Sequence, residues 1–170
     1  MIDTTSFKLA AENMAYDLRC LEQLQLANEK SFFRFYRWKD KGLTYPKRIS
    51  LPESLGSLDA GIRATGGGIV FHSPGDMVIS IGGKYNVDLF PKEWRGIMDV
   101  VKFKFLNSFT RLGLTVIESN RKEVENHMFC LSYGNPYELY FEDQKVLAIA
   151  MRRFKDYFLI QGIVYLPVTF

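Results

Sequence analysis

Residues 63–72 read Arg-Ala-Thr-Gly-Gly-Gly-Ile-Val-Phe-His, the most distinctive local pattern in the chain. Consecutive glycines lose backbone entropy on folding, about 0.5–1 kcal/mol each relative to alanine, so a folded domain keeps them where its backbone must approach a ligand. Exposed N–H groups in Gly66–Gly68 can hold a phosphate or a carboxylate, and Arg63 can add a bidentate cation. The run is neither a Walker A loop nor a GxGxxG loop. A plain glycine turn is the alternative interpretation.

The segments that flank the glycine run predict an extended structure. Ile69–Phe71 and Met77–Ile81 are short apolar runs joined by Ser73-Pro74-Gly75-Asp76, a strong turn sequence, so they predict a β-hairpin. Residues 39–60 contain two prolines and scattered polar side chains. We expect a long loop there, with at most a short helix near Pro52–Leu58.

Two longer segments have helical patterns. Residues 9–28 place apolar side chains on one stripe, and residues 91–112 begin with a proline and end before a glycine. Further strands are expected at 32–38, 114–118, 137–142, 145–151 and 157–168, with a turn at Asp143-Gln144. The expected fold is therefore a single α+β domain with a mainly antiparallel sheet and two long helices.

Composition limits the classes of function. Of the 170 residues, 47% are apolar and 24% are charged, which is typical of a globular domain. A net charge of +3 does not by itself favour a nucleic-acid partner. No apolar run approaches the roughly 18 residues that span a bilayer, and the N-terminus does not resemble a secretory signal. With two cysteines and two histidines, we expect no metal site and a cytoplasmic location.

Three single side chains outside the glycines could carry chemistry. Lys145 enters an apolar strand, where desolvation is costly unless the ammonium meets an anion such as one held by the glycine run. The alternative is a surface lysine on an edge strand. His72 is either a site residue or a satisfied polar group. Cys130 is either a nucleophile activated by Lys145 or a buried inert thiol.

The segment 32–48 interleaves basic and aromatic residues, a combination that also suits single-stranded nucleic acid. We prefer a sheet strand whose aromatic side chains point inward and whose basic side chains, including Arg34, are solvated. The pair Arg152-Arg153 is interpreted in the same way, as surface charge.

Several blocks of the chain, in order, resemble motifs of the lipoate–protein ligase family, within the biotin/lipoate ligase superfamily. The glycine block resembles the family signature RRxTGGGAVxH. The segment that carries Lys145 resembles YEL…GKKIAGSAQRR. The other similar blocks are Asn13–Asp17 (the opening helix), Phe33–Trp38 (RFYRW) and Phe158–Gly162 (FLQHGS).

The resemblance implies a fold like the cores of class II aminoacyl-tRNA synthetases and biotin ligases. It implies that ATP, with Mg²⁺, activates lipoate or a similar acyl acid, which then passes to a lysine of an acceptor domain. That acceptor would be the lipoyl domain of a 2-oxoacid dehydrogenase or a glycine-cleavage H-type protein. By matching position, Lys145 would contact the carboxyl oxygen and the phosphate. The implied substrate- and nucleotide-binding residues are Arg63, Thr65, Gly66, Gly67, Gly68, His72 and Trp38.

Two alternatives stay open within this resemblance. Octanoyl- and lipoyl-transferases of one branch carry a catalytic cysteine near the position of Cys130, and they need no ATP. A degenerate, non-catalytic lipoyl-binding paralogue is the other, because Ile62 and Ala148 replace an arginine and a glycine of the family motifs. Residues 1–170 are interpreted as one ligase-like catalytic domain without the usual C-terminal extension.

Overall fold

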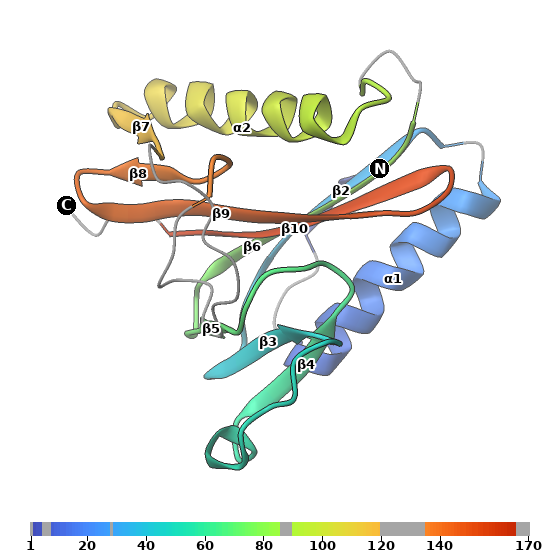
Figure 1. The fold of residues 1–170 in the computed structure, drawn as a ribbon, viewed down its shortest axis with the longest axis vertical. Helices are drawn as coiled ribbons and strands as arrows, with labels where there is room; N and C mark the ends of the chain where they lie inside the picture. The colour runs from blue at the N-terminus through green and yellow to red at the C-terminus, as the bar shows by residue number, and fades with distance from the viewer. Residues whose placement is uncertain (1, 5–7, 28, 86–89, 120–134, 166–170) are drawn as a thin grey trace.

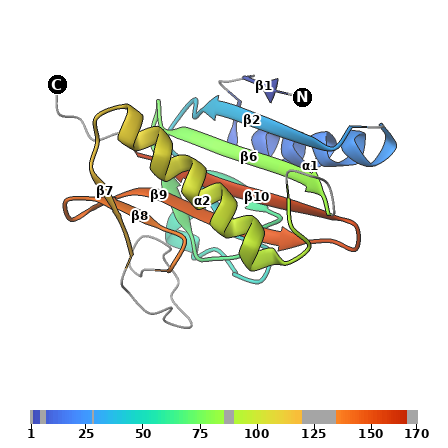
Figure 2. The same ribbon diagram turned by 90° about the horizontal axis from the view of Figure 1, so that it is seen from above.

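The computed structural model describes residues 2–4, 8–27, 29–85, 90–119 and 135–165. A seven-stranded sheet forms the middle layer, with helix α2 on one face (Figures 1 and 2). Helix α1 and a three-stranded sheet lie on the other face (Figure 1). This confirms the expected α+β class with a large, mostly antiparallel sheet and two long helices.

The large sheet has the strand order β1-β2-β6-β10-β9-β8-β7, and all its pairs are antiparallel except β1 with β2. Its strands are β1 (Ile2–Asp3), β2 (Ser31–Arg37), β6 (Met77–Lys84), β7 (Val116–Glu118), β8 (Leu139–Phe141), β9 (Gln144–Arg153) and β10 (Tyr157–Val164). The small sheet, in the order β4-β3-β5, consists of β3 (Gly42–Pro46), β4 (Asp59–Arg63) and β5 (Val70–His72).

Both predicted helices form within a few residues of their expected ends. Helix α1 spans Ala10–Leu26, and its first N–H groups are satisfied by carboxylates: Leu9 N–H donates to Glu12 and Ala10 N–H to Asp59. Helix α2 spans Trp94–Arg111, so the predicted proline precedes the helix. Neither helix is long and apolar enough to cross a membrane.

The main core lies between α2 and the large sheet. Buried side chains of α2 pack on those of β6, β8, β9 and β10; they include Ile97, Met98, Val101, Ile79, Leu139, Leu147, Ile149 and Ile160. A second group joins α1 to the opposite face of the sheet, and it includes Cys20, Leu21, Leu24, Phe32 and Leu159. The site described below lies on the face of the large sheet that α1 covers, and it extends to the edge of the face that α2 covers.

Two expectations about the middle of the chain are wrong. Residues 39–60 are not one long loop, because β3 forms within them and pairs in parallel with β4, which begins at Asp59. The short helix expected near Pro52–Leu58 is confirmed as the 3₁₀ helix Glu53–Leu55. The predicted hairpin does not form, because β5 pairs with β3 and β6 joins the large sheet. Its turn does exist, with Asp76 N–H donating to the Ser73 carbonyl at 3.0 Å, but it connects two sheets.

The C-terminal strands follow the prediction with small shifts. The turn between β8 and β9 falls on Glu142-Asp143, one residue before the expected position, and Glu142 has a φ of 52°. The last predicted strand is a single strand, β10, paired with both β6 and β9. Strand β9 is therefore an interior strand, which excludes an edge position for Lys145.

Candidate functional site

The glycine run lies between β4 and β5, and two arginines hold its carbonyl groups. Arg63, the last residue of β4, donates from Nε and Nη2 to the carbonyl oxygen of Gly66, at 3.1 and 2.8 Å. Its Nη2 also donates to the carbonyl oxygen of Gly68. Arg48 donates from Nη2 to the carbonyl oxygen of Gly67 at 3.2 Å. All three glycine carbonyls therefore accept hydrogen bonds from guanidinium groups.

The N–H groups of the three glycines have a different environment. Within the part of the chain that the structure describes, Gly66, Gly67 and Gly68 donate no hydrogen bond. Gly67 has a φ of 92°, in the left-handed region that favours glycine. A Cβ at Gly66 would meet no atom within 4 Å, so the space beside it is open. Donors without partners beside open space are what a bound phosphate or carboxylate requires.

A chain of polar contacts holds Arg63 in place. Its Nη1 donates to the carbonyl oxygen of Thr44 at 2.8 Å and to Thr44 Oγ1 at 3.3 Å. The same hydroxyl forms a hydrogen bond with His72 Nε2, 3.0 Å away, whose direction depends on the tautomer of the ring. Burial, helped by the Arg63 charge, lowers the pKa of His72 to about 3, so the ring is neutral near pH 7. His72 in turn stacks on Trp38, with ring centroids 4.1 Å apart.

Two cavities of different size adjoin this arrangement. The smaller, of about 50 Å³, is lined by Arg63 and His72 together with apolar residues of β9 and β10. A cavity that binds benzene has a volume of about 150 Å³. The smaller cavity therefore has no room for a lipoyl chain in this conformation.

The larger cavity is a cleft of about 360 Å³, within the range of roughly 300–1,000 Å³ that is usual for ligand sites. Gly66 and Gly67 line it together with residues of α2 and β9. Trp94 and Tyr137, whose rings meet edge to face at 5.9 Å, supply aromatic surface, and Arg153 supplies a cation. Its aliphatic lining comes from Met98, Ile149, Ala150 and Met151. The cleft thus combines apolar walls with the unpartnered glycine N–H groups.

Lys145 meets an anion, but that anion belongs to the protein. Its Nζ lies 2.8 Å from Oε1 of Glu138, and the two side chains are 8% and 0% exposed. Glu138 also accepts hydrogen bonds from the N–H and Nδ2 of Asn135 and from the Tyr140 hydroxyl, at 2.9–3.1 Å. Lys145 lines neither cavity beside the glycine run, whereas Asn135 lines the larger one. Glu138 and Asn135 therefore connect the ammonium to the cleft.

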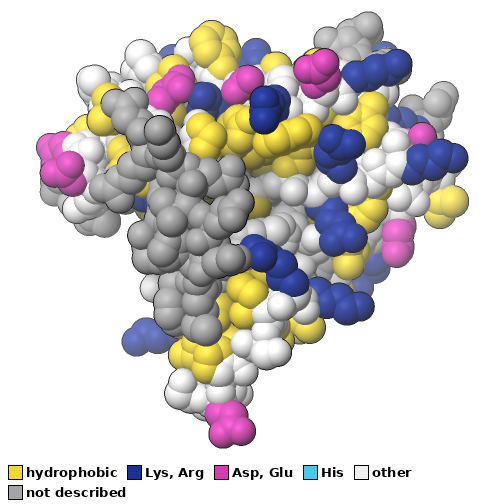
Figure 3. Space-filling view, viewed as in Figure 1, with side chains coloured by type: hydrophobic (Ala, Val, Ile, Leu, Met, Phe, Trp, Pro, Cys, Tyr) yellow, Lys and Arg dark blue, Asp and Glu magenta, His cyan; other side chains and the backbone are white. Residues whose placement is uncertain are grey.

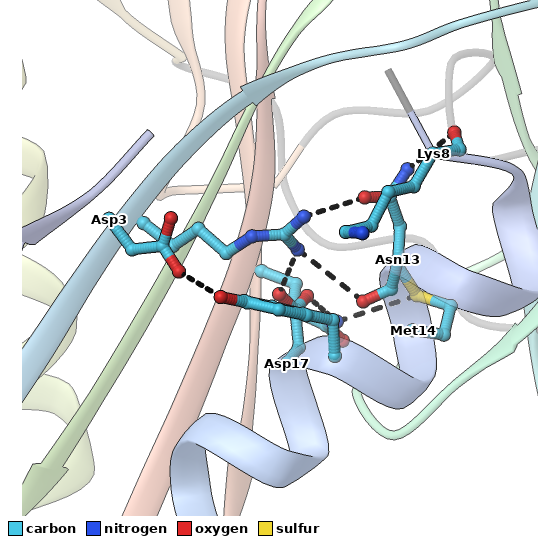
Figure 4. A network of polar contacts seen from close by, with 8 residues as sticks. Asp3, Lys8, Asn13, Met14 and Asp17 are labelled. Atoms are coloured by element: carbon cyan, nitrogen blue, oxygen red, sulfur yellow. Dashed lines mark hydrogen bonds and ion pairs between the residues drawn. The ribbon is translucent and has the colours of Figure 1, made fainter. Parts of the chain in front are cut away.

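A buried polar network connects the glycine run to α1, β2 and β10. Arg34 is fully buried and donates from Nη1 to Asp17 at 2.6 Å and from Nη2 to the Asn13 side chain at 2.7 Å. Figure 4 shows Asn13 and Asp17 projecting from α1 into this network. Gln161 donates to Asp17 at 2.7 Å and accepts from the Thr65 hydroxyl at 3.0 Å. Burial raises the pKa of Asp17, and the charge of Arg34 opposes that shift.

The network corrects the prediction that Arg34 is solvated. On β2 the buried face carries Phe32, Arg34 and Tyr36, so the arginine lies on the inward face between two aromatic residues. The presence of Asp17 on the neighbouring helix, spaced one turn after Asn13, is the sequence feature that could have indicated a buried partner.

Cys130 lies outside the described residues, so the structure bears on neither interpretation of it. Among the described residues, no group of three or more His, Cys, Asp or Glu side chains could hold a metal ion. Arg48, Trp94 and Tyr137 were given no role in the site from sequence. Arg153 was interpreted as surface charge, and it is exposed, but it also lines the cleft. For Arg153, the match to the family motif that follows Lys145 was the available signal.

No protein-family model and no curated protein matches the chain, whereas solved structures do. A lipoate–protein ligase A bound with ATP matches with a TM-score of 0.74 and 19% identity, over 98% of this chain and 65% of the ligase. The lipoate protein ligase of Thermoplasma acidophilum, described as bi-partite, matches with a TM-score of 0.68 and 18% identity, over 99% of this chain and 62% of the ligase. The biotin protein ligase from Leishmania major matches with a TM-score of 0.52 and 12% identity, over 98% of this chain and 57% of the ligase.

These similarities define the fold. The chain has the fold shared by lipoate–protein ligases and biotin ligases, as the motif resemblance implied. Within that class, the lipoate–protein ligases are the better match, with a TM-score of 0.74 against 0.52 for the Leishmania major biotin ligase. The chain spans 65% and 62% of the lengths of the two lipoate ligases.

Proposed function

We propose that this chain is a ligase-like catalytic domain that activates lipoate, or a similar acyl acid, with ATP and transfers the acyl group to a lysine of an acceptor domain. The observation that carries the proposal is the glycine run. Its carbonyls are bonded by Arg63 and Arg48, while its N–H groups have no partner within the described residues, and two of its glycines, Gly66 and Gly67, line a cleft of about 360 Å³. Such preorganised donors stabilise charge that develops beside them. A ligase with the same fold is bound with ATP.

In the proposed first step, a carboxylate oxygen of the acyl acid attacks the α-phosphorus of ATP. The new bond joins the acyl oxygen to phosphorus, and the bond to pyrophosphate breaks. The N–H groups of Gly66–Gly68 donate to the α-phosphate oxygens, where negative charge accumulates. Arg63 and Thr65 act as positioning residues in this scheme, because their side chains are bonded to the run and to Gln161.

In the proposed second step, the amine of the acceptor lysine attacks the acyl carbon. The bond from that carbon to the phosphate oxygen breaks, AMP leaves, and the amine nitrogen loses a proton to solvent water. In both steps Lys145 stabilises the developing negative charge, first on the α-phosphate and then on the acyl oxygen, by exchanging its contact with Glu138 for one with the reacting group. A lysine ammonium is suited to this exchange because it is a compact charge on a flexible stem.

The acyl chain is proposed to lie in the larger cleft, against Met98, Ile149 and Met151. His72 and Trp38 do not contact the acyl chain in this proposal. Trp38 stacks on His72, His72 bonds Thr44, and Thr44 accepts from Arg63, so the two residues help to position Arg63. Mg²⁺, where it takes part, would be bound chiefly by the phosphates of ATP, and we assign no step to it. The acceptor is proposed to be the lipoyl domain of a 2-oxoacid dehydrogenase or an H-type protein, since a ligase with this fold was studied with its E2 lipoyl domain.

Incubation of the purified protein with lipoate, ATP and Mg²⁺ tests the proposal. We expect mass spectrometry to detect lipoyl-AMP, with one pyrophosphate released for each adenylate formed. Lys145→Ala should lower this rate by about 10²-fold or more while circular dichroism stays native. The matched control is Lys41→Ala, an exposed lysine outside both cavities, which should keep the wild-type rate.

Three outcomes would overturn the proposal. Normal adenylate formation by Lys145→Ala would remove the role assigned to that residue. A hydroxylamine-labile acyl adduct on Cys130, formed from a lipoyl thioester without ATP and lost in Cys130→Ser, would replace the ligase by an acyltransferase. Stable binding of a lipoyl domain with neither reaction would make the chain a non-catalytic binding module.

A further inference from the structure

A second, larger groove lies between the start of α2 and the turn that joins β9 to β10, and its volume is about 680 Å³. Lys92 and Arg95 line it from the helix side, and Arg153 and Lys155 line it from the turn side. Figure 3 shows Lys and Arg side chains gathered along this side of the molecule. We refer to this surface as the basic groove.

The basic groove carries more positive than negative charge. All four cations are exposed, and none of them takes part in an ion pair within the described residues. Two acids, Glu93 and Asp156, share the lining, so cations outnumber acids by four to two. Like charges on one surface create a positive potential that attracts an acidic partner and steers its approach.

The basic groove adjoins the cleft beside the glycine run. Trp94 and Arg153 line both of them. The Trp94 side chain is 37% exposed, and the guanidinium of Arg95 lies 5.5 Å from its ring centroid. A molecule bound in the basic groove would therefore lie beside the cleft.

We propose that the basic groove binds the acidic face of the acceptor domain and so directs the acceptor lysine to the cleft. This inference rests on the proposed function and names the surface chemistry of its partner. A phosphate site is typically built from backbone N–H groups, and those lie at the glycine run. Arg95 and Arg153 are exposed on two separate elements and line the groove together with the exposed indole of Trp94, which matches instead the arginine- and tryptophan-rich composition of protein interfaces.

Charge reversal tests the docking surface in the whole protein. The variant Arg95→Glu/Lys155→Glu is compared with Lys39→Glu/Lys41→Glu, which changes the net charge equally at exposed residues outside the groove. The probe is a purified, unlipoylated lipoyl domain with an acidic surface. We expect kcat/KM for its modification to fall about tenfold or more in the groove variant only, and the wild-type value to fall with added salt. The rate of lipoyl-AMP formation should stay unchanged.

The same variants separate the remaining outcomes. A raised KM for ATP in adenylate formation would show that the groove binds polyphosphate, and would overturn the inference. An equal loss in both variants would show a general charge effect, and would also overturn it. If wild-type protein makes no lipoyl-AMP, the proposed function fails, and calorimetric binding of the lipoyl domain still decides whether the groove docks it.

Discussion

Two buried ion pairs lie among the residues that the structure describes, and they are built differently. The pair of Arg34 with Asp17 has no exposed side-chain surface, and the guanidinium lies between the rings of Tyr16 and Tyr36, 4.5 and 3.8 Å from their centroids. The pair of Lys145 with Glu138 keeps 8% exposure on the lysine side. The first pair is enclosed among α1, β2 and β10, whereas the second is connected to the cleft.

The difference indicates that the two pairs have different roles. A guanidinium is planar, always charged and fixed by several directional bonds, so it suits a permanent connection between elements. An ammonium is a point charge on a flexible stem and can change partners at little geometric cost. The arginine pair is therefore expected to be needed for stability, and the lysine pair for the proposed chemistry.

The largest effect is expected from Arg34→Met. Removing one partner of a fully buried pair leaves an uncompensated carboxylate, which costs about 3–5 kcal/mol in the free energy of unfolding. Urea denaturation at pH 7 measures the loss, with Lys39→Met at an exposed position as the control. A loss below about 1 kcal/mol would mean that Asp17 does not need this partner.

A smaller loss of stability is expected from Lys145→Met, about 1–3 kcal/mol. Glu138 stays buried, but it keeps hydrogen bonds from Asn135 and Tyr140, which compensate part of the missing charge. The same urea experiment provides the comparison. If Lys145→Met costs as much as Arg34→Met, the two pairs are equivalent and the contrast between them disappears.

The smallest expected effect is a dependence of the free energy of unfolding on pH that comes from His72. It must be distinguished from the contributions of the two ion pairs when the protein is studied in acid. The pKa of His72 is lowered from 6.5 to about 3 by burial, so between these values the unfolded chain binds a proton that the folded chain does not. The free energy of unfolding should therefore fall as the pH decreases through this window, by about 1 kcal/mol between pH 6 and pH 5. The Asp17 carboxyl, whose pKa is raised, contributes in the opposite direction.

The variant His72→Gln isolates this contribution, since the carboxylates are the same in both proteins. Its unfolding free energy should change less between pH 6 and pH 5 than that of the wild type, when both are measured by urea denaturation. Equal slopes would show that His72 is not the group that titrates.

The fold was predictable where local pattern decides it. Both helices have a one-sided apolar stripe, and β2, β9 and β10 are long runs with high strand propensity. Strands β3 and β4 escaped prediction because they are five residues each, contain Gly42, Pro46 and Gly61, and depend on pairing with distant segments. Strand β5 has three residues, too few for an adjacent turn to decide its partner.

The site was predictable in its composition and less so in its geometry. The glycine run and Lys145 stand out because their residue types are costly without a function. That Arg63 is bonded to carbonyls, and that Lys145 pairs with Glu138, depends on side-chain positions that no local pattern encodes. Arg34 was misjudged for the same reason, because its partner Asp17 lies on another element.

The contacts of Gln161 have a consequence for the timing of assembly. This side chain connects to Asp17, 144 residues earlier in the chain, and to Thr65, 96 residues earlier. Contacts between such distant segments require closure of long loops, which costs entropy before any bond is gained. We therefore expect the glycine run to reach its final position only after β10 has joined the sheet. A nascent chain still lacking β10 would contain the glycines, Arg48 and Arg63, but not the Gln161 contact that holds Thr65.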